Sequence, residues 1–451
     1  MPGFLAQNLM KAMPKIGVAL YSDGSPFSRE GNVACEFRKE PFSFGTTSDL
    51  PGQTLWITNA TLNDLIEAGL HKNPKIAHEG YYRSRLSQIG QELGIAKLPI
   101  DQQAPLLAEI LGNAAEMARV QFGLTQYPSN GLAQAVGQLH GQNEPANGTA
   151  LLQVAEQACQ RYTACERERR YDKADVFSFW LPRYQWANEL MREPLPVSDT
   201  INAIPAHALP GMGRDVSSLV EWAQTNRIPL FARIKIRGLE QTIGKLMNYG
   251  AGAQGISKDT QAGAYEARNM REWCALPELE TLSQVGEVEI LQVAVAGGWA
   301  ASGLNLYSSK LSQISYAYGL VAENIWVGLT RKPNPYGSTS RTLRTAWLQS
   351  IDRMRCLRIA ERLYNLGMEV VNYGNGRIMV VCPPSVRALI PQAALEEGML
   401  YPAHLDGLQA YQPSQQQPLH VMQHLIAARD YGRLVGVDQR ALQELEASRG
   451  A

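Results

Sequence analysis

The sequence predicts an α/β protein in which helices and strands are mixed along the chain, and three observations lead to this class. Short apolar runs alternate with Gly, Ser and Pro over residues 15–60, which is typical of strands and turns. The pattern becomes largely helical over residues 62–191. A regular helix, a tight hairpin and another helical stretch then follow between residues 342 and 398. A chain of 451 residues can supply two or three domains with cores of their own.

Residues 1–75 are predicted to form a small N-terminal mixed α/β region. Ile16–Leu20 and Thr54–Thr58 are apolar runs that indicate strands. Residues 76–190 are predicted to form a helical connector, interrupted by two loop compositions at residues 127–131 and 141–148.

Residues 191–411 are predicted to form the second mixed unit. Pro229–Ile236 indicates a strand, although the same residues could extend a helix. The clearest element is a helix over Thr342–Leu366, with Gly367 at the expected C-terminal cap. Its apolar residues recur every three or four positions: Leu343, Trp347, Ile351, Met354, Leu357 and Ala360. The arginines of this stretch could line a basic groove or form a solvated face: Arg341, Arg344, Arg353, Arg355, Arg358 and Arg362.

A β-hairpin is expected directly after this helix, over residues 368–383. Its two apolar strands meet at Gly374, Asn375 and Gly376, and these residue types tolerate the positive φ angles of a tight turn. Ser385–Gly398 indicates the following helix. Residues 412–451 are predicted to be a linker rich in Gln and Pro, followed by two short amphipathic helices.

Composition limits the classes of function. The chain has 42 basic and 42 acidic residues, and this zero net charge gives little general affinity for nucleic acids. Its six cysteines are scattered without metal-ligand spacing, so free thiols are expected rather than a zinc site. The sequence contains no apolar run of the ~18–20 residues that span a bilayer and no signal-peptide pattern. A cytoplasmic protein without a membrane partner is the expectation.

Several segments, taken in order over residues 175–411, resemble the polymerase domain of bacteriophage-type family A DNA polymerases. Val197–Asp199 resembles the strand end that holds the first metal-binding aspartate, and residues 213–216 resemble the Gly-x-Asp-Ile/Val segment downstream of it. Residues 244–252 resemble the fingers helix that meets the incoming nucleotide. The resemblance implies that Lys245 contacts phosphate and that Tyr249, four residues on, shares its helix face.

Later segments continue the same resemblance. Residues 306–310 and 318–324, together with Arg331, match further motifs of the family. The resemblance therefore adds Lys310, Tyr318, Asn324 and Arg331 to Lys245 and Tyr249 as candidate nucleotide- or DNA-binding residues. It also implies a right-hand polymerase fold, with palm and fingers in residues 191–411 and a reduced helical thumb in residues 76–190.

The metal-binding positions depart from the family pattern. Asp199 is a remnant of the first catalytic acid, whereas the family's His-Asp-Glu triplet falls on Asn375, Gly376 and Arg377. Nucleotidyl transfer uses two divalent ions about 4 Å apart, held by carboxylates. Gly376 has no side chain, and a guanidinium such as Arg377 at ~4 Å from a metal ion would repel it by several kcal/mol. The expectation is a degenerate polymerase that holds no metal or other cofactor.

The N-terminal region could be the remnant of a proofreading exonuclease. Asp23 is a lone acid in this region, and residues 171–175 fit a Tyr-x-x-x-Asp pattern. Residues 77–83 faintly resemble the family's His-Asn-x-x-Phe-Asp strand, with Arg83 in place of the acid. A proofreading site requires four carboxylates around two metals, so the resemblance gives this activity little support.

Three functions remain open from the sequence. The first is a non-catalytic polymerase-like protein that binds DNA or a replication partner in a phage or mobile element, within the host cytoplasm. The second is an active, divergent DNA-directed DNA polymerase that uses Mg²⁺ bound by other acids, such as Asp352 or Glu369. The third is a structural or assembly protein with no nucleic-acid role, which the neutral charge favours. A homo- or hetero-oligomer fits each of them.

Overall fold

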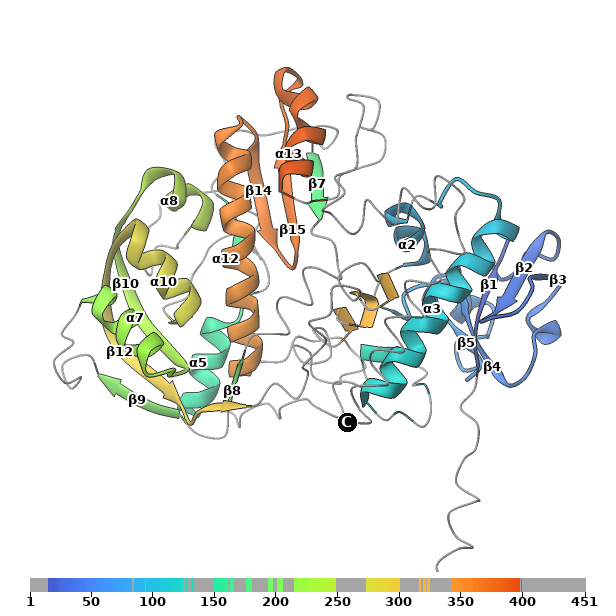
Figure 1. Cartoon of the computed structure of the whole chain (residues 1–451), viewed down its shortest axis with the longest axis horizontal. Helices are drawn as coiled ribbons and strands as arrows, with labels where there is room; N and C mark the ends of the chain where they lie inside the picture. Colours follow the sequence, from blue (N-terminus) through green and yellow to red (C-terminus); the bar gives the residue numbers. More distant parts are fainter. Residues whose placement is uncertain are drawn as a thin grey trace, which may run out of the picture.

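The fold is described from a computed structural model of the chain. The longer described segments are residues 15–82, 85–93, 95–122, 149–160, 176–180, 194–197, 201–205, 215–248, 273–300 and 342–397. Shorter described pieces are residues 124, 127, 131–133, 163–165, 316–317, 319–321, 323–324 and 399. Within these residues the protein is a mixed α/β structure, with an N-terminal unit on one side and two further sheets around a long helix on the other (Figure 1).

A five-stranded sheet in the order β3-β2-β1-β4-β5 forms the N-terminal unit. β1 runs parallel to β4, and β4 runs parallel to β5, whereas β2 and β3 are antiparallel additions. The elements are β1 Lys15–Leu20, β2 Asn32–Glu36, β3 Phe42–Phe44, η1 Thr47–Asp49, β4 Thr54–Thr58, α1 Leu62–Glu67 and β5 Ile76–Ala77. Both predicted strands are therefore confirmed.

Successive side chains of β1 point to opposite faces of this sheet, and each face is covered by its own core. Ile16, Val18 and Leu20 belong to the large core, whereas Ala19 and Tyr21 belong to a smaller core on the opposite face. Helix α3 (Ile100–Phe122) packs on β1 and β2, next to α2 (Leu86–Glu92).

The N-terminal unit extends past the predicted boundary at residue 75. β5 begins at Ile76 and completes the sheet, and α3 covers one of its faces. The predicted connector is also not wholly helical. It contains α5 (Ala150–Ala158), but β6 (Thr163–Ala164) and β7 (Val176–Trp180) are strands, in which Phe177 and Phe179 are buried alternately.

A second sheet has the order β11-β10-β12-β9, and β8 and β13 form a separate pair. The strands are β8 Leu195–Pro196, β9 Ile201–Pro205, β10 Leu230–Leu239, β11 Trp273–Ala275, β12 Gly286–Ala296 and β13 Trp299–Ala300. Helices α7 (Val216–Thr225) and α10 (Leu276–Val285) pack on it, and α8 (Gln241–Met247) follows β10. Residues 230–236 are thus part of a strand and not of a helix.

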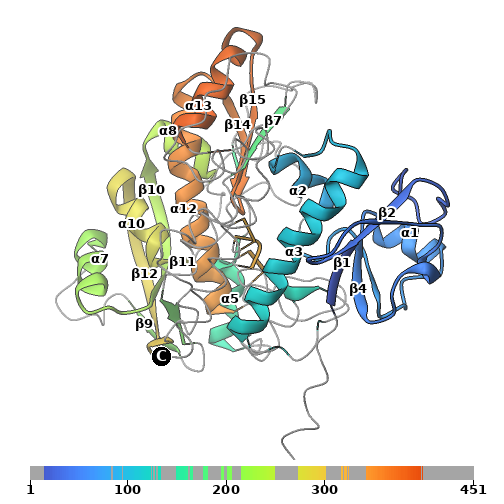
Figure 2. The same ribbon diagram turned by 45° about the vertical axis from the view of Figure 1, so that its right-hand side comes forward.

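The third sheet contains the predicted hairpin, in the order β6-β14-β15-β7. Its strands β14 (Glu369–Gly374) and β15 (Arg377–Val381) follow α12 (Leu343–Asn365), which agrees closely with the predicted helix. The chain continues into η4 (Pro384–Leu389) and α13 (Ile390–Glu396). Figures 1 and 2 show α12 running between the second sheet and the hairpin.

Helix α12 is buried on nearly all of its sides. Trp347 packs edge-on against Phe231 at 5.8 Å and against Trp299 at 5.0 Å between ring centroids. Arg353 forms a fully buried ion pair with Glu278 of α10 at 2.8 Å. Of the predicted basic face, only Arg358 and Arg362 are exposed among the described residues, and Arg362 pairs with Glu397 at 2.7 Å. The helix is therefore a central packing element rather than a basic groove.

In the part of the chain that the structure describes, every helix is too short or too polar to cross a membrane.

Candidate functional site at the hairpin tip

The tip of the β14–β15 hairpin is a two-residue turn. Asn375 and Gly376 both have positive φ angles, of 55° and 68°, and they lie between the paired residues Gly374 and Arg377. Turns of this kind favour Asn-Gly because both central residues adopt left-handed conformations. The predicted hairpin and its turn are confirmed.

The carboxylate at this tip comes from the preceding helix. Asp352 of α12 is only 1% exposed, and its two oxygens accept hydrogen bonds from the backbone N–H groups of Asn375 and Gly376 (2.9 Å for Gly376). Cys356, one turn further along α12, donates to Asp352 Oδ1 at 3.8 Å. The sequence suggested Asp352 only as an alternative metal ligand, whereas the structure places it as the anchor of the turn.

Cys356 reinforces this anchor and is chemically inert. Its thiol is completely buried, and burial, followed by the nearby charge of Asp352, raises its pKa well above the usual value. A thiol of this kind stays protonated, so it acts as a small packing group and a weak donor.

Arg377 occupies the first position of β15, beside the turn. Its guanidinium contacts the sulfur of Met379, and its backbone pairs with Gly374 on one side and Trp180 on the other. A permanent cation therefore lies next to the turn, as the sequence predicted.

The strand beside the hairpin is β7, which comes from the region that was predicted to be a helical connector. β7 pairs with β15, and its sequence Val-Phe-Ser-Phe-Trp contains no acid. The segment leading to Asp199 belongs instead to the β8–β13 pair, where the N–H of Val197 donates to the carbonyl of Gly298 at 2.8 Å. Asp199 itself lies outside the described residues. Both edges of the hairpin are already occupied, by β6 and β7.

The predicted fingers helix is short in the described structure. Lys245 is half-buried on α8, which has seven residues and ends at Asn248 in a left-handed conformation. Arg237, which precedes this helix by one helical turn of sequence, lies on strand β10. Tyr249, Lys310, Tyr318 and Arg331 lie outside the described residues.

Asn324 is a buried side chain with partners inside the protein. It is 0% exposed, and its Nδ2 donates to the carbonyls of Tyr82 at 3.2 Å and Leu320 at 2.8 Å. These contacts indicate that Asn324 joins its own segment to the N-terminal unit.

Glu369 cannot act together with Asp352. It begins β14 and pairs with Val381, at the end of the hairpin away from the turn. Asn375 lies six positions after Glu369 along the strand, which corresponds to ~20 Å.

The suggested exonuclease residues do not form a carboxylate cluster among the described positions. Asp23 is exposed and accepts from the N–H of Ser25 at 2.9 Å. His78 Nδ1 accepts from the N–H of Gly80 at 3.0 Å, and burial lowers the pKa of His78. Glu79 pairs with Arg85 at 3.4 Å. Arg83 and residues 171–175 lie outside the described residues.

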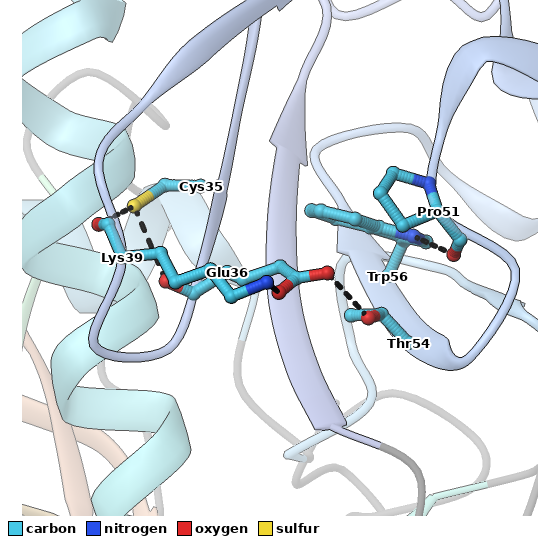
Figure 3. A network of polar contacts seen from close by, with 6 residues as sticks. All are labelled: Cys35, Glu36, Lys39, Pro51, Thr54 and Trp56. Atoms are coloured by element: carbon cyan, nitrogen blue, oxygen red, sulfur yellow. Dashed lines mark hydrogen bonds and ion pairs between the residues drawn. The ribbon is translucent and has the colours of Figure 1, made fainter.

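A polar cluster that the sequence did not reveal lies in the N-terminal sheet, where β2 ends and β4 begins (Figure 3). Glu36 is 4% exposed, accepts from Thr54 Oγ1 at 2.8 Å and pairs with Lys39. Burial acts to raise the pKa of Glu36, but the bonds from Lys39 and Thr54 outweigh it and hold the pKa below the usual value. Cys35 Sγ donates to the carbonyl of Lys39 at 3.1 Å, and burial raises the pKa of Cys35 to about 11. These contacts tie β2 to β4 and leave no reactive group.

Comparison with known proteins finds similarity to solved structures only at low sequence identity. Neither a protein-family model nor a curated protein matches the sequence. The solved structures to which the chain is similar include DNA polymerases.

The particular neighbours are complexes of phi29 DNA polymerase. The complex with single-stranded DNA is 9% identical, with a TM-score of 0.39 over 82% of this chain and 80% of that one. The complex with primer-template DNA and incoming nucleotide is also 9% identical, with a TM-score of 0.40 over 82% and 81%. Scores this low do not establish a common fold. Phi29 DNA polymerase is a family B enzyme, so these neighbours give the family A resemblance no support.

Proposed function

We propose that this protein is a polymerase-like protein that does not transfer nucleotides and that binds DNA or a protein partner of DNA replication. The observation that supports the proposal most strongly is the occupied hairpin turn. Asn375, Gly376 and Arg377 stand where the resemblance expects the catalytic acids, and the carboxylate of Asp352, which reaches the turn, is engaged by the N–H groups of the turn.

The chemistry of Asp352 explains why this arrangement suits anchoring better than metal binding. A catalytic carboxylate offers its oxygen lone pairs to Mg²⁺ in an open site. Asp352 is buried, and both of its oxygens accept backbone hydrogen bonds. Removing this carboxylate would leave both N–H groups without their acceptor, at a cost of about 1–3 kcal/mol for the buried N–H of Gly376 and less for the half-buried Asn375.

The polymerase part of the proposal rests on the ordered sequence segments and on the helix, hairpin and helix that follow one another from residue 343 to residue 396. It does not extend to a particular polymerase family, because the sequence segments resemble family A and the comparisons give that resemblance no support. A role in a phage or mobile element, in the host cytoplasm, is part of the proposal.

Primer extension tests the loss of catalysis. Purified protein, a labelled primer-template and all four deoxynucleotides are incubated with Mg²⁺ and, separately, with Mn²⁺. We expect no extended product from the wild type. Extension that disappears in Asp352→Asn but persists in Glu369→Gln would overturn the proposal and identify an active, divergent polymerase.

DNA binding is tested separately, by fluorescence anisotropy with single-stranded and duplex oligonucleotides over a range of salt concentrations. We expect affinity that falls with salt, because phosphate contacts release counterions. In the same assay, Lys245→Ala is expected to weaken binding. If the wild type binds neither oligonucleotide at low salt, the DNA part of the proposal fails.

A further inference from the structure

Strands β10 and β12 are longer than their neighbours β11 and β9 and continue past them as a two-stranded ribbon. β11 pairs only with residues 231–233 of β10, and β9 pairs only with residues 292–296 of β12. Among the described residues, the remaining halves pair only with each other, from Ile234 opposite Ile290 to Leu239 opposite Gly286. The ribbon ends beside α8 and α10, where the N–H of Glu240 donates to the carbonyl of Val285 at 2.9 Å. Figure 1 shows these strands at the outer margin of the molecule.

The two faces of the ribbon have opposite character. Ile234, Ile236 and Ile290 are buried, with exposures of 1%, 4% and 1%. Arg233 and Lys235 alternate with them and are half-exposed, and the side chain of Arg237 is 48% exposed. Basic residues two apart on a strand lie on one face, ~6.6 Å from each other.

Contacts on β12 show that the three cations share one surface. Lys235 is opposite Glu289 in the strand register, and the guanidinium of Arg237 pairs with the carboxylate of that same Glu289. Arg233 is opposite Gln292. We call this surface, formed by Arg233, Lys235 and Arg237, the basic row.

We propose that the basic row binds the phosphate backbone of duplex DNA, with the ribbon lying along a groove. The inference rests on the proposed function and adds the binding surface to it. A two-stranded ribbon fits the major groove of B-DNA, and cations on one face of a strand can each reach a different phosphate. The register of the ribbon shifts between Arg233 and Ile234 and between Ile236 and Gly238, so the spacing along the row is not uniform. The chain as a whole has zero net charge, so attraction for DNA must come from a local concentration of cations such as this one.

The acids of β12 make this surface adjustable. Glu289 pairs with Arg237. Glu287, two residues earlier on β12, is exposed. Both carboxylates repel phosphate, so their removal frees Arg237 and raises the positive potential of the row. Binding that becomes tighter in such a variant cannot result from misfolding.

The test compares three variants by anisotropy with a fluorescent 20-base-pair duplex and with oligodeoxythymidylate. The row variant carries Arg233→Gln, Lys235→Gln and Arg237→Gln. The acid variant carries Glu287→Gln and Glu289→Gln. The control carries Arg29→Gln, Lys72→Gln and Lys75→Gln, which change exposed cations of the N-terminal unit.

We expect the row variant to lose about tenfold or more in duplex affinity and to reduce the slope of log K against log salt by about 3, since each phosphate contact contributes about 0.9. The acid variant should bind more tightly, and the control should match the wild type.

If the wild type binds duplex DNA while the row and acid variants behave like the control, the basic row is not the site. A preference for oligodeoxythymidylate that depends on the row would also overturn the duplex proposal. If the wild type binds neither the duplex nor oligodeoxythymidylate, the DNA part of the proposed function fails, and the basic row fails with it.

Discussion

Single residues determine what the hairpin tip can do. The turn follows from two adjacent residue types, Asn375 and Gly376, so the sequence predicts it from local rules. Its anchor does not follow from such rules, because Asp352 contacts the turn across 23 and 24 residues of sequence. An aspartate in the middle of a predicted helix carries no local signal of a tertiary hydrogen bond.

Asp352→Ala is expected to destabilise the protein by about 2–3 kcal/mol, because it leaves buried N–H groups of the turn without acceptors. Urea unfolding followed by circular dichroism measures the loss. Arg358→Ala, an exposed change on the same helix, is the matched control and should cost less than about 0.5 kcal/mol. Equal stabilities of the two variants would contradict the anchoring role.

Among secondary-structure elements, helices with clear caps were predicted best. The predicted helix over Thr342–Leu366 agrees with α12, because apolar periodicity and Gly367 mark its end. The neighbours of the hairpin were not predictable, because β6 and β7 are short and lie in a region that the composition marks as helical. The segment at residues 213–216, which resembles a polymerase motif, includes Asp215 as the N-cap of α7.

Asp215 accepts from the N–H of Ser218 at 2.9 Å, and the bonds from the Ser218 hydroxyl and N–H lower its pKa below 3.8. A lowered folded pKa means that the cap stabilises the helix above about pH 4 and that this contribution disappears as pH falls through the folded pKa. Asp215→Ala should therefore cost about 1 kcal/mol at pH 7 and much less at pH 2.5. Thermal unfolding at both pH values measures this, with Glu221→Ala, an exposed change on α7, as the control. A cost that does not change with pH would count against the cap.

At the scale of the molecule, α12 connects the second and third sheets, and this could not be predicted from its sequence alone. Its arginines were expected to form either a groove or a solvated face, yet Arg353 pairs with Glu278 at complete burial. The partner of a buried charge lies 75 residues away, so only the tertiary structure reveals it.

Removing one partner of this buried ion pair should strongly destabilise the protein. Arg353→Met alone is expected to cost about 3–5 kcal/mol, because it leaves the carboxylate of Glu278 buried without its partner. The double variant with Glu278→Leu should recover most of the loss in urea unfolding. The exposed pair Arg362 and Glu397 provides the comparison, and Arg362→Met there should cost less than about 1 kcal/mol. Similar losses at both pairs would show that burial is not the cause.

The sheet β6-β14-β15-β7 has a consequence for how the chain is made. Val176–Trp180 pairs with Arg377–Val381, so strands from the middle of the polypeptide find their partners only near its end. While the ribosome is still synthesising the residues between them, β6 and β7 have emerged without neighbours and can associate with other nascent chains. Because contacts this distant in sequence form slowly, completion of the sheet should be a late event in biogenesis, and chaperones should matter most during that interval.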